Sequence, residues 1–235
     1  MSVPITALAA VAADPPEIPE ADIARAVERH FGLLGDYSPL VSERDQNLLL
    51  RVQNGNKYVV KVTGPSEPSV TSEFQTSALV HIAGIRALQT PRVVRTLDGL
   101  LSTTIEHNGE SCRLRVVSYV AGELMASVSI NAGLAMDFGA RLAGLDRALA
   151  GFSHTGERPA LLWDLQRATE LKSLFVYIDD LTARERVAGA IDDFENRVLP
   201  GLPGLRKQVI HGDANPENVL VDAAGHRVSG IIDFG

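Results

Sequence analysis

Hydrophobic and polar residues follow two different patterns along this chain, and the change falls near residue 120. Before it, short apolar or alternating runs are separated by turn-forming residues, which is typical of an antiparallel sheet. After residue 130, apolar residues recur at helical spacing. The pattern therefore predicts an α+β chain with two lobes, the first built on a sheet with a packed helix and the second mainly helical.

Turn signals separate the predicted elements of the first lobe. Asn54-Gly55, Asp98-Gly99 and Asn108-Gly109 are two-residue hairpin signals between apolar runs. The expected helices cover residues 20–31 and 69–84, and the expected strands cover residues 37–41, 47–53, 57–63, 93–97, 100–106 and 111–120.

Helices and a small hairpin are expected in the second lobe. The helices are indicated by the apolar spacing from Leu134 to Leu145 and over residues 162–178 and 182–198, and short strands are expected at residues 209–210, 219–221 and 227–233. Prolines at residues 15, 16 and 19 cannot continue a helix. We therefore divide the chain into a flexible arm at residues 1–19, a first lobe at 20–120 and a second lobe at 121–235.

The end of the chain contains the most specific motif. His211-Gly212-Asp213 is followed five residues later by Asn218, and an apolar strand then ends in Asp233-Phe234-Gly235. This spacing is typical of a kinase-type phosphoryl-transfer site, in which Asp213 accepts the proton of the substrate hydroxyl. Asn218 and Asp233 would hold Mg²⁺ against the nucleotide phosphates. We place His211 in the same catalytic loop, where it would support the loop by hydrogen bonding.

The alternative interpretation is that these residues belong to ordinary turns and strand ends, because Asp, Asn, Pro and Gly all form turns. Each residue taken alone favours that simpler interpretation. Their combined order, in a strand–loop–strand–hairpin–strand context, favours the kinase site.

The first lobe offers an independent signal. Lys61 lies in an apolar predicted strand after a hairpin, where a kinase needs one lysine to reach the α- and β-phosphates. Glu73 in the following helix is the candidate ion-pair partner of this lysine, and Glu67 is also near in sequence. A strand lysine can equally be a solvated edge residue.

A phosphate-covering loop is expected at residues 42–47, between the first two strands. Its candidate nucleotide-binding residues are Arg44, Asp45, Gln46 and Asn47. The chain contains neither G-x-G-x-x-G nor G-x-x-x-x-G-K-[ST], so protein kinases and P-loop enzymes both fit poorly.

Composition narrows the class of protein further. The formal net charge of −7 offers no basic patch for nucleic acid. Cys112 is the one cysteine, so no internal disulfide can form, and a cytoplasmic location is expected. No apolar run approaches the roughly 20 residues of a membrane span. The small apolar residues 5–13 lack the basic start of a signal peptide, and we assign them to the arm.

Together these motifs resemble the aminoglycoside phosphotransferase/choline kinase-like superfamily, whose members have a two-lobed, protein-kinase-like fold. The shared motifs are residues 211–218 and 231–235. Within it, the chain looks most like hydroxylysine kinase and its bacterial relatives. The segments that carry this narrower resemblance are residues 44–48, 58–62, 114–122, 142–149, 162–165 and 228–235.

The resemblance implies roles for specific residues. Asp213 would be the catalytic base, Asn218 and Asp233 the Mg²⁺ ligands, and Lys61 the phosphate-binding lysine. Backbone groups of Val117, Ser118 and Tyr119 would hold the nucleotide base. The phosphoryl donor is expected to be ATP or GTP, because hydroxylysine kinase prefers GTP.

Members of this superfamily continue well beyond the Phe-Gly pair, whereas this chain ends there. We therefore expect a fragment of a longer protein. Some bacterial relatives carry this domain ahead of an aminotransferase-like domain, which would lie beyond residue 235.

The leading hypothesis is thus a small-molecule kinase that acts on a hydroxyl of an amine-bearing metabolite such as hydroxylysine. An aminoglycoside kinase would use the same site chemistry, and fold cannot separate the two. A nucleotide-binding regulatory module without turnover is the third hypothesis, and a metal hydrolase using His211 and Asp213 is disfavoured by the scattered positions of the other histidines.

Overall fold

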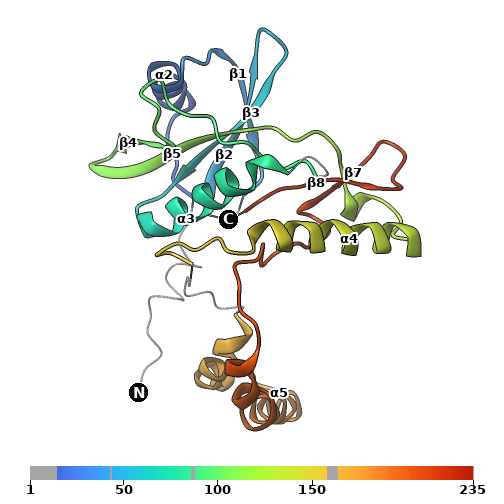
Figure 1. Cartoon of the computed structure of the whole chain (residues 1–235). Coiled ribbons are helices and arrows are strands. Elements are labelled where there is room, and N and C mark those ends of the chain that lie inside the picture. Colours follow the sequence, from blue (N-terminus) through green and yellow to red (C-terminus); the bar gives the residue numbers. More distant parts are fainter. Residues whose placement is uncertain (1–14, 43, 86–87, 158–163, 235) are drawn as a thin grey trace. The chain divides into compact units, whose positions relative to one another are not determined.

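The computed structural model describes residues 15–42, 44–85, 88–157 and 164–234. These residues form two compact units, one made of residues 15–157 with 208–234 and the other of residues 164–207. Figure 1 shows their helices and strands coloured along the sequence. The division falls inside the predicted second lobe, because residues 164–207 pack chiefly on themselves.

The first unit is built around a five-stranded antiparallel sheet with the order β1-β2-β3-β5-β4. Its strands are β1 (Gly35–Leu40), β2 (Asp45–Val52), β3 (Lys57–Thr63), β4 (Thr103–His107) and β5 (Glu110–Ser118). The turns predicted at Asn54-Gly55 and Asn108-Gly109 connect β2 to β3 and β4 to β5. Gly55 and Gly109 both have positive φ, as such turns require.

One face of this sheet is apolar and is covered by helix α2 (Glu20–Phe31) (Figure 1). The helix is amphipathic, and its spacing turns Ile23, Val27 and Phe31 into the core. Alternate residues of the strands point to the same core, in which the fully buried sheet residues are Leu50, Val60, Val62, Leu114 and Val116. Burial of each such side chain stabilises the fold by about 1.5–3 kcal/mol.

The opposite face of the sheet is partly polar and meets helix α3 (Ser69–His81), which continues into the 3₁₀ turn η1 (Ile82–Gly84). Thr63 and Arg115 are buried polar residues of this face, and Ser72 and Gln75 of α3 are buried against them. The lysine predicted to bind phosphate lies on this same face.

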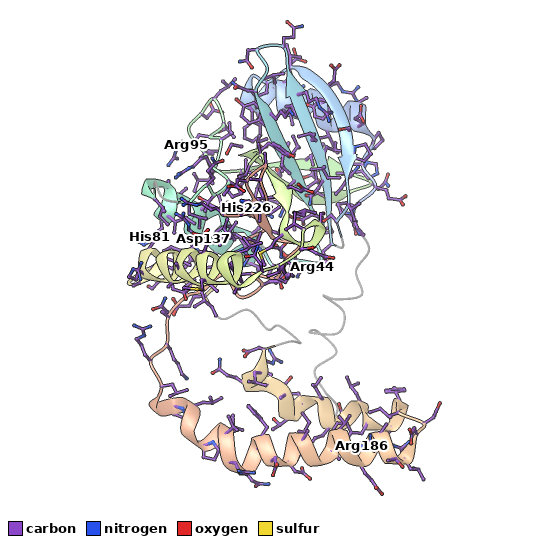
Figure 2. The ribbon with its side chains drawn as sticks, turned by 90° about the vertical axis from the view of Figure 1, so that its right-hand side faces the viewer. Arg44, His81, Arg95, Asp137, Arg186 and His226 are labelled. Atoms are coloured by element: carbon purple, nitrogen blue, oxygen red, sulfur yellow. The ribbon has the colours of Figure 1, made fainter. Side chains whose placement is uncertain are left out.

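A second, three-stranded sheet has the order β6-β7-β8 and consists of β6 (Glu123–Leu124), β7 (Val219–Val221) and β8 (Val228–Ile231). The short 3₁₀ helix η2 (Met125–Ser127) follows β6. Helix α4 (Ala132–Leu149) packs on this sheet through buried leucines and is capped by Asn131, whose Oδ1 accepts a 2.9 Å hydrogen bond from the Leu134 N–H. On α4, Asp137, labelled in Figure 2, accepts a 2.8 Å hydrogen bond from the Val228 N–H of β8.

A short segment after η1 joins the two sheets through main-chain atoms. The Gln89 N–H donates to the Ser229 carbonyl at 3.1 Å, and the Ile231 N–H donates to the Gln89 carbonyl at 3.0 Å. A few residues later the Arg92 carbonyl accepts a 2.8 Å bond from the Ser118 N–H at the end of β5. The strand that precedes Asp233 is therefore tied by backbone to the sheet that holds Lys61.

Some predicted elements need correction. Residues 93–97 do not form a strand, because Val93 makes only an isolated bridge to Val117 and the chain then turns at Asp98-Gly99. Residues 209–210 are also not a strand. Ile18 was assigned to the flexible arm, but its side chain is buried and its N–H and carbonyl both bond the Gln46 side chain. Residues 1–14 of that arm lie outside the described residues.

The second unit contains helical elements only within residues 164–207. They are the 3₁₀ stretch η3 (Leu165–Tyr177), α5 (Leu181–Asp193), the π-helical turn η4 (Phe194–Val198) and the 3₁₀ turn η5 (Leu199–Gly204). The predicted helix at residues 162–178 is thus 3₁₀ over its described part, and residues 162–163 lie outside that part. Across the described residues of both units, no helix has the length and apolar character needed to cross a membrane.

Candidate active site

The loop from His211 to Asn218 holds Asp213 by side-chain amides. Asn215 Nδ2 donates to Asp213 Oδ1 at 2.9 Å, and Asn218 Nδ2 donates to Asp213 Oδ2 at 3.0 Å and to its carbonyl at 2.9 Å. The Asp213 side chain is exposed at the surface of the loop. Its carboxylate is therefore oriented by neutral donors and is accessible to a substrate.

His211 links this loop to the strand on its other side. Its Nε2 lies 3.0 Å from the Ile232 carbonyl, which can only accept, and its Nδ1 accepts from the Asp213 N–H at 3.3 Å. These partners select the neutral tautomer that carries its proton on Nε2. Burial lowers the pKa of His211, although the bond to Ile232 opposes this effect. The rings of His211 and Phe234 pack edge-on, with their centroids 4.6 Å apart.

Asp233 follows β8 in a left-handed conformation, with φ of 61°, which is uncommon for a residue other than glycine. Such a conformation persists where surrounding contacts fix it. One of these contacts is the 2.9 Å bond from the Ile232 N–H to the Asn218 carbonyl, which joins the catalytic loop to this strand end. The residues predicted as metal ligands are thus tied together by backbone.

Lys61, the predicted phosphate-binding lysine, forms an ion pair with Asp233 at this strand end. Lys61 Nζ lies 3.2 Å from Asp233 Oδ1 and 3.4 Å from Asp45 Oδ2, and its side chain is 13% exposed. Burial by itself would raise the pKa of Asp233, but the charge and hydrogen bond of Lys61, together with the charges of His211 and Arg44, hold this pKa below the usual range of aspartate. Asp233 is therefore ionised at neutral pH.

The predicted pairing of Lys61 with Glu73 is wrong. Glu73 Oε1 instead accepts a 3.1 Å bond from Arg113 Nη2 of β5, and half of its side chain is exposed. On α3 it is Ser72 and Gln75 that face the sheet. Helix geometry turns Glu73 about 100° away from Ser72, toward the edge of the sheet.

Arg115 is a site residue that the sequence interpretation missed. It is the register partner of Lys61 on the neighbouring strand, so the two cations lie side by side on one face. Its Nη1 donates to Gln75 Oε1 at 2.7 Å, its Nη2 donates to Thr63 Oγ1 at 3.0 Å, and Nη2 lies 3.6 Å from Asp45 Oδ2. Burial lowers the pKa of Arg115, and the charge of Asp45 opposes that effect. An arginine between the apolar residues Leu114 and Val116 was the signal that would have found it.

The segment predicted as a phosphate-covering loop is divided between a loop and a strand. Asp45, Gln46 and Asn47 are the first residues of β2, so their side chains alternate between the two faces of the sheet. Gln46 points to the α2 side and clamps Ile18 through bonds of 2.9 and 2.8 Å, which corrects its assignment as a nucleotide ligand. Asn47 lies directly opposite Lys61, and its Oδ1 is buried without a hydrogen-bond partner.

The segment predicted to hold the nucleotide base lies at the end of β5. The Ser118 N–H donates to the Arg92 carbonyl at 2.8 Å, and the Tyr119 N–H donates to the Lys57 carbonyl at 3.0 Å. Val117 is buried. The amides of Ser118 and Tyr119 are thus already used within the protein.

The donor set at the strand end fits a hard divalent cation. Mg²⁺ prefers oxygen ligands from one or two side chains. Asp233 provides an ionised carboxylate, and Asn218 uses its Nδ2 on Asp213, which leaves its Oδ1 as the atom that could bind the ion. Arg44, labelled in Figure 2 and predicted to bind phosphate, lowers the pKa of Asp233 through its charge.

Comparison with known proteins places this arrangement in a family. The sequence profile described as "Phosphotransferase enzyme family" matches residues 36–235, which include both sheets and the catalytic loop. The chain belongs to this family. This single match to the family profile includes four predicted site residues, Lys61, Asp213, Asn218 and Asp233.

Named relatives are similar over most of this chain. It is 31% identical to hydroxylysine kinase of Mus musculus over 245 residues, covering 94% of this chain and 65% of the relative. It is 28% identical to hydroxylysine kinase of Danio rerio over 233 residues, covering 93% of this chain and 65% of the relative. The chain therefore spans slightly less than two thirds of the length of these relatives.

Solved structures of small-molecule kinases share the fold. A complex of amicoumacin kinase with AMP-PNP, Ca²⁺ and its ligand superimposes with a TM-score of 0.65 at 12% identity, covering 92% of this chain and 64% of that one. A microcompartment-associated aminopropanol kinase gives a TM-score of 0.63 at 17% identity, covering 92% and 69%. The α+β, protein-kinase-like fold predicted from the motifs is confirmed.

Proposed function

We propose that this chain carries the nucleotide-binding and catalytic residues of a magnesium-dependent kinase. In this proposal the γ-phosphoryl group of ATP or GTP moves to a hydroxyl of a small amine-bearing metabolite of the hydroxylysine type. The observation that supports it most directly is the ion pair between Lys61 and Asp233. It lies beside a loop in which Asp213 is exposed and is oriented by hydrogen bonds.

The side chains suit the separate tasks of phosphoryl transfer. Asp213, held by the two asparagine amides, would accept the proton of the acceptor hydroxyl as the oxygen attacks. Lys61 would contact the nucleotide phosphates. Asn218 and Asp233 would hold the magnesium ion, which when bound would neutralise phosphate charge. His211, neutral and fully engaged, would keep the loop in register with the strand end.

The acceptor class rests on similarity. The two relatives described above, which are 28–31% identical, are both named hydroxylysine kinases, which favours an acceptor with a hydroxyl and an amine. The structures of antibiotic kinases share only the fold with this chain and do not bear on the acceptor. The relatives give no support for a fused aminotransferase-like domain, which is not part of the proposal. The proposal does include a cytoplasmic location, because the single cysteine of the chain is buried and free.

The test is release of nucleoside diphosphate by the protein expressed from its full reading frame, with ATP and GTP in parallel. The acceptors are 5-hydroxylysine, ethanolamine, choline and an aminoglycoside. Asp213→Asn should lower the rate about 10²–10⁴-fold, because it removes the proton acceptor, while nucleotide affinity is retained. Glu217→Gln, an exposed carboxylate of the same loop, serves as the matched control and should leave the rate unchanged.

The outcomes separate the hypotheses. Release with 5-hydroxylysine and not with the aminoglycoside supports the proposal, and the reverse result would identify an antibiotic kinase. Magnesium-dependent nucleotide binding with no release for any acceptor would indicate a regulatory module. Wild-type turnover by Asp213→Asn would show that another group accepts the proton.

A further inference from the structure

We propose that Asp45 is the residue that positions Lys61 for the nucleotide phosphates, and that Arg115 fixes Asp45 in turn. In this arrangement the lysine depends on a carboxylate of its own sheet rather than on a glutamate of helix α3. The proposal rests on the proposed function, since it concerns the lysine of the same site.

Helix α3 does not offer a carboxylate to Lys61 at its sheet-facing positions. Those positions are occupied by Ser72 and Gln75, which are both neutral and both bond Arg115. Glu73 bonds Arg113 instead. Helix α3 is therefore linked to the lysine through Arg115.

The sheet itself creates the need for a carboxylate. Lys61 and Arg115 are directly opposite each other on β3 and β5, and like charges in that relation are destabilising. The side chains of Lys61, Arg115 and Asp45 are only 13%, 5% and 10% exposed, so water screens their charges weakly. Asp45 Oδ2 lies 3.4 Å from Lys61 Nζ and 3.6 Å from Arg115 Nη2. One carboxylate oxygen thus forms ion pairs with both cations and reduces their mutual repulsion.

The backbone fixes where that oxygen lies. Asp45 begins β2 and pairs in register with Thr63, two residues beyond Lys61 on the neighbouring strand. Arg115 is in turn held by Thr63 and Gln75 at 3.0 and 2.7 Å. Arg115 is thus held by groups from β3 and α3 independently of its contact with Asp45. The ammonium of Lys61 is consequently held on its sheet side, while Asp233, a partner from the second sheet, is half exposed.

Two other carboxylates near the site belong to Glu67 and Asp233. Glu67 precedes α3, burial raises its pKa, and its Oε1 is buried without a hydrogen-bond partner. The charge of Arg115 opposes this rise more strongly than the charge of Lys61 does. Asp233 pairs with Lys61 but belongs to the second sheet and carries the predicted metal-binding role. Asp45 Oδ2 lies within ion-pair distance of both Lys61 and Arg115.

Kinetics of substituted proteins test the proposal. Asp45→Asn should lower kcat/KM for the nucleotide about 10²-fold, with a raised nucleotide KM and an unchanged acceptor KM, because a misplaced lysine loses phosphate contacts. A merely structural role would lower the active fraction without changing either KM. Asp45→Glu, which keeps the charge, should recover part of the loss. Asp36→Asn, an exposed carboxylate of β1, is the matched control.

The competing role of the helix is tested by Glu73→Gln, which should change the nucleotide KM less than about twofold, as expected for an exposed ion pair. A larger loss for Glu73→Gln than for Asp45→Asn would overturn the proposal. If Asp45→Asn fails to fold because Arg115 is left uncompensated, the double variant Asp45→Asn/Arg115→Gln removes both charges. It should fold and still show the raised nucleotide KM, and a wild-type KM in that variant would also overturn the proposal.

A measurement without turnover separates this proposal from the proposed function. Acylation of lysines by an amine-reactive reagent is followed by mass spectrometry, with the exposed Lys57 of the same strand as internal reference. Lys61 should react faster in Asp45→Asn than in wild type, and at the wild-type rate in Glu73→Gln. The opposite order would refute the role of Asp45. Absence of phosphoryl transfer in the wild type would instead count only against the kinase.

Discussion

Lys61 and Asp233 are separated by 172 residues in the sequence, yet Lys61 Nζ lies 3.2 Å from Asp233 Oδ1. The lysine comes from the central strand of the five-stranded sheet, and the aspartate follows the last strand of the three-stranded sheet. Their ion pair connects the predicted phosphate-binding and metal-binding residues, so a change at one should be felt at the other.

Asp233→Asn should weaken binding of the magnesium–nucleotide complex about 10–100-fold, because a charged oxygen ligand is lost and Lys61 loses a partner. Titration calorimetry with nucleotide in the presence and absence of Mg²⁺ measures this effect. Asp98→Asn in an exposed turn is the control. Equal affinities of Asp233→Asn and wild type with Mg²⁺ would remove Asp233 from the metal site.

Stability should depend on pH through His211. Burial lowers its pKa below the ordinary value of 6.5, so below that pH the unfolded chain binds a proton that the folded chain refuses. The contribution of His211 to stability is therefore complete above pH 6.5 and is lost as the pH falls from 6.5 through its lowered folded pKa. Wild type should lose stability in this window relative to His211→Gln, which has no titrating group.

Urea unfolding of both proteins at a pH above and a pH below this window measures the difference. Because other groups titrate in both proteins, the quantity that matters is the change in the stability gap between them. A gap that is the same at both pH values would show that His211 is protonated equally in the folded and unfolded states.

Gly230 of β8 lies against the segment that joins the two sheets. A Cβ at this position would lie 2.8 Å from Val120 Cγ1 and 3.1 Å from the Gln89 carbonyl. Gly230→Ala should therefore destabilise the fold by about 1–3 kcal/mol through overpacking. Gly139 in α4 has open space around its Cβ position, and Gly139→Ala should stabilise by about 0.4–1 kcal/mol. Thermal unfolding of the pair checks both signs.

The apolar face of the large sheet should dominate stability. Leu50 is fully buried between β1, β3 and α2, and Leu50→Ala should cost about 2–5 kcal/mol. Leu34 is 60% exposed, and Leu34→Ala should change stability by less than about 0.5 kcal/mol. Denaturant unfolding of the two variants makes the comparison, and equal losses would contradict the assignment of this core.

Local signals were enough to predict much of this fold. The Asn54-Gly55 turn set the pairing of β2 with β3, and the strand at residues 57–63 was predicted with its observed bounds. Helix α2 was also predicted correctly from its apolar spacing and the glycine that ends it. These elements are specified by residues close in sequence, which is the information that a pattern contains.

The partners of the site residues could not be predicted in the same way. Gln46 was assigned to a loop because the start of β2 was placed two residues late. In the structure Gln46 belongs to β2, and strand alternation turns its side chain to the α2 face of the sheet. Glu73 was paired with Lys61 because the rotation of α3 about its axis was unknown. The role of Arg115 depends on a register between β3 and β5, whose paired residues are 50 to 60 positions apart.

The join made by Gln89 uses only its N–H and carbonyl. Its side chain can therefore change among homologous sequences without disturbing the relation between the two sheets. Proline is the exception, since it would remove the donor to Ser229. We thus expect position 89 to tolerate nearly every amino acid except proline, even though the distance between Lys61 and Asp233 depends on the backbone of this residue.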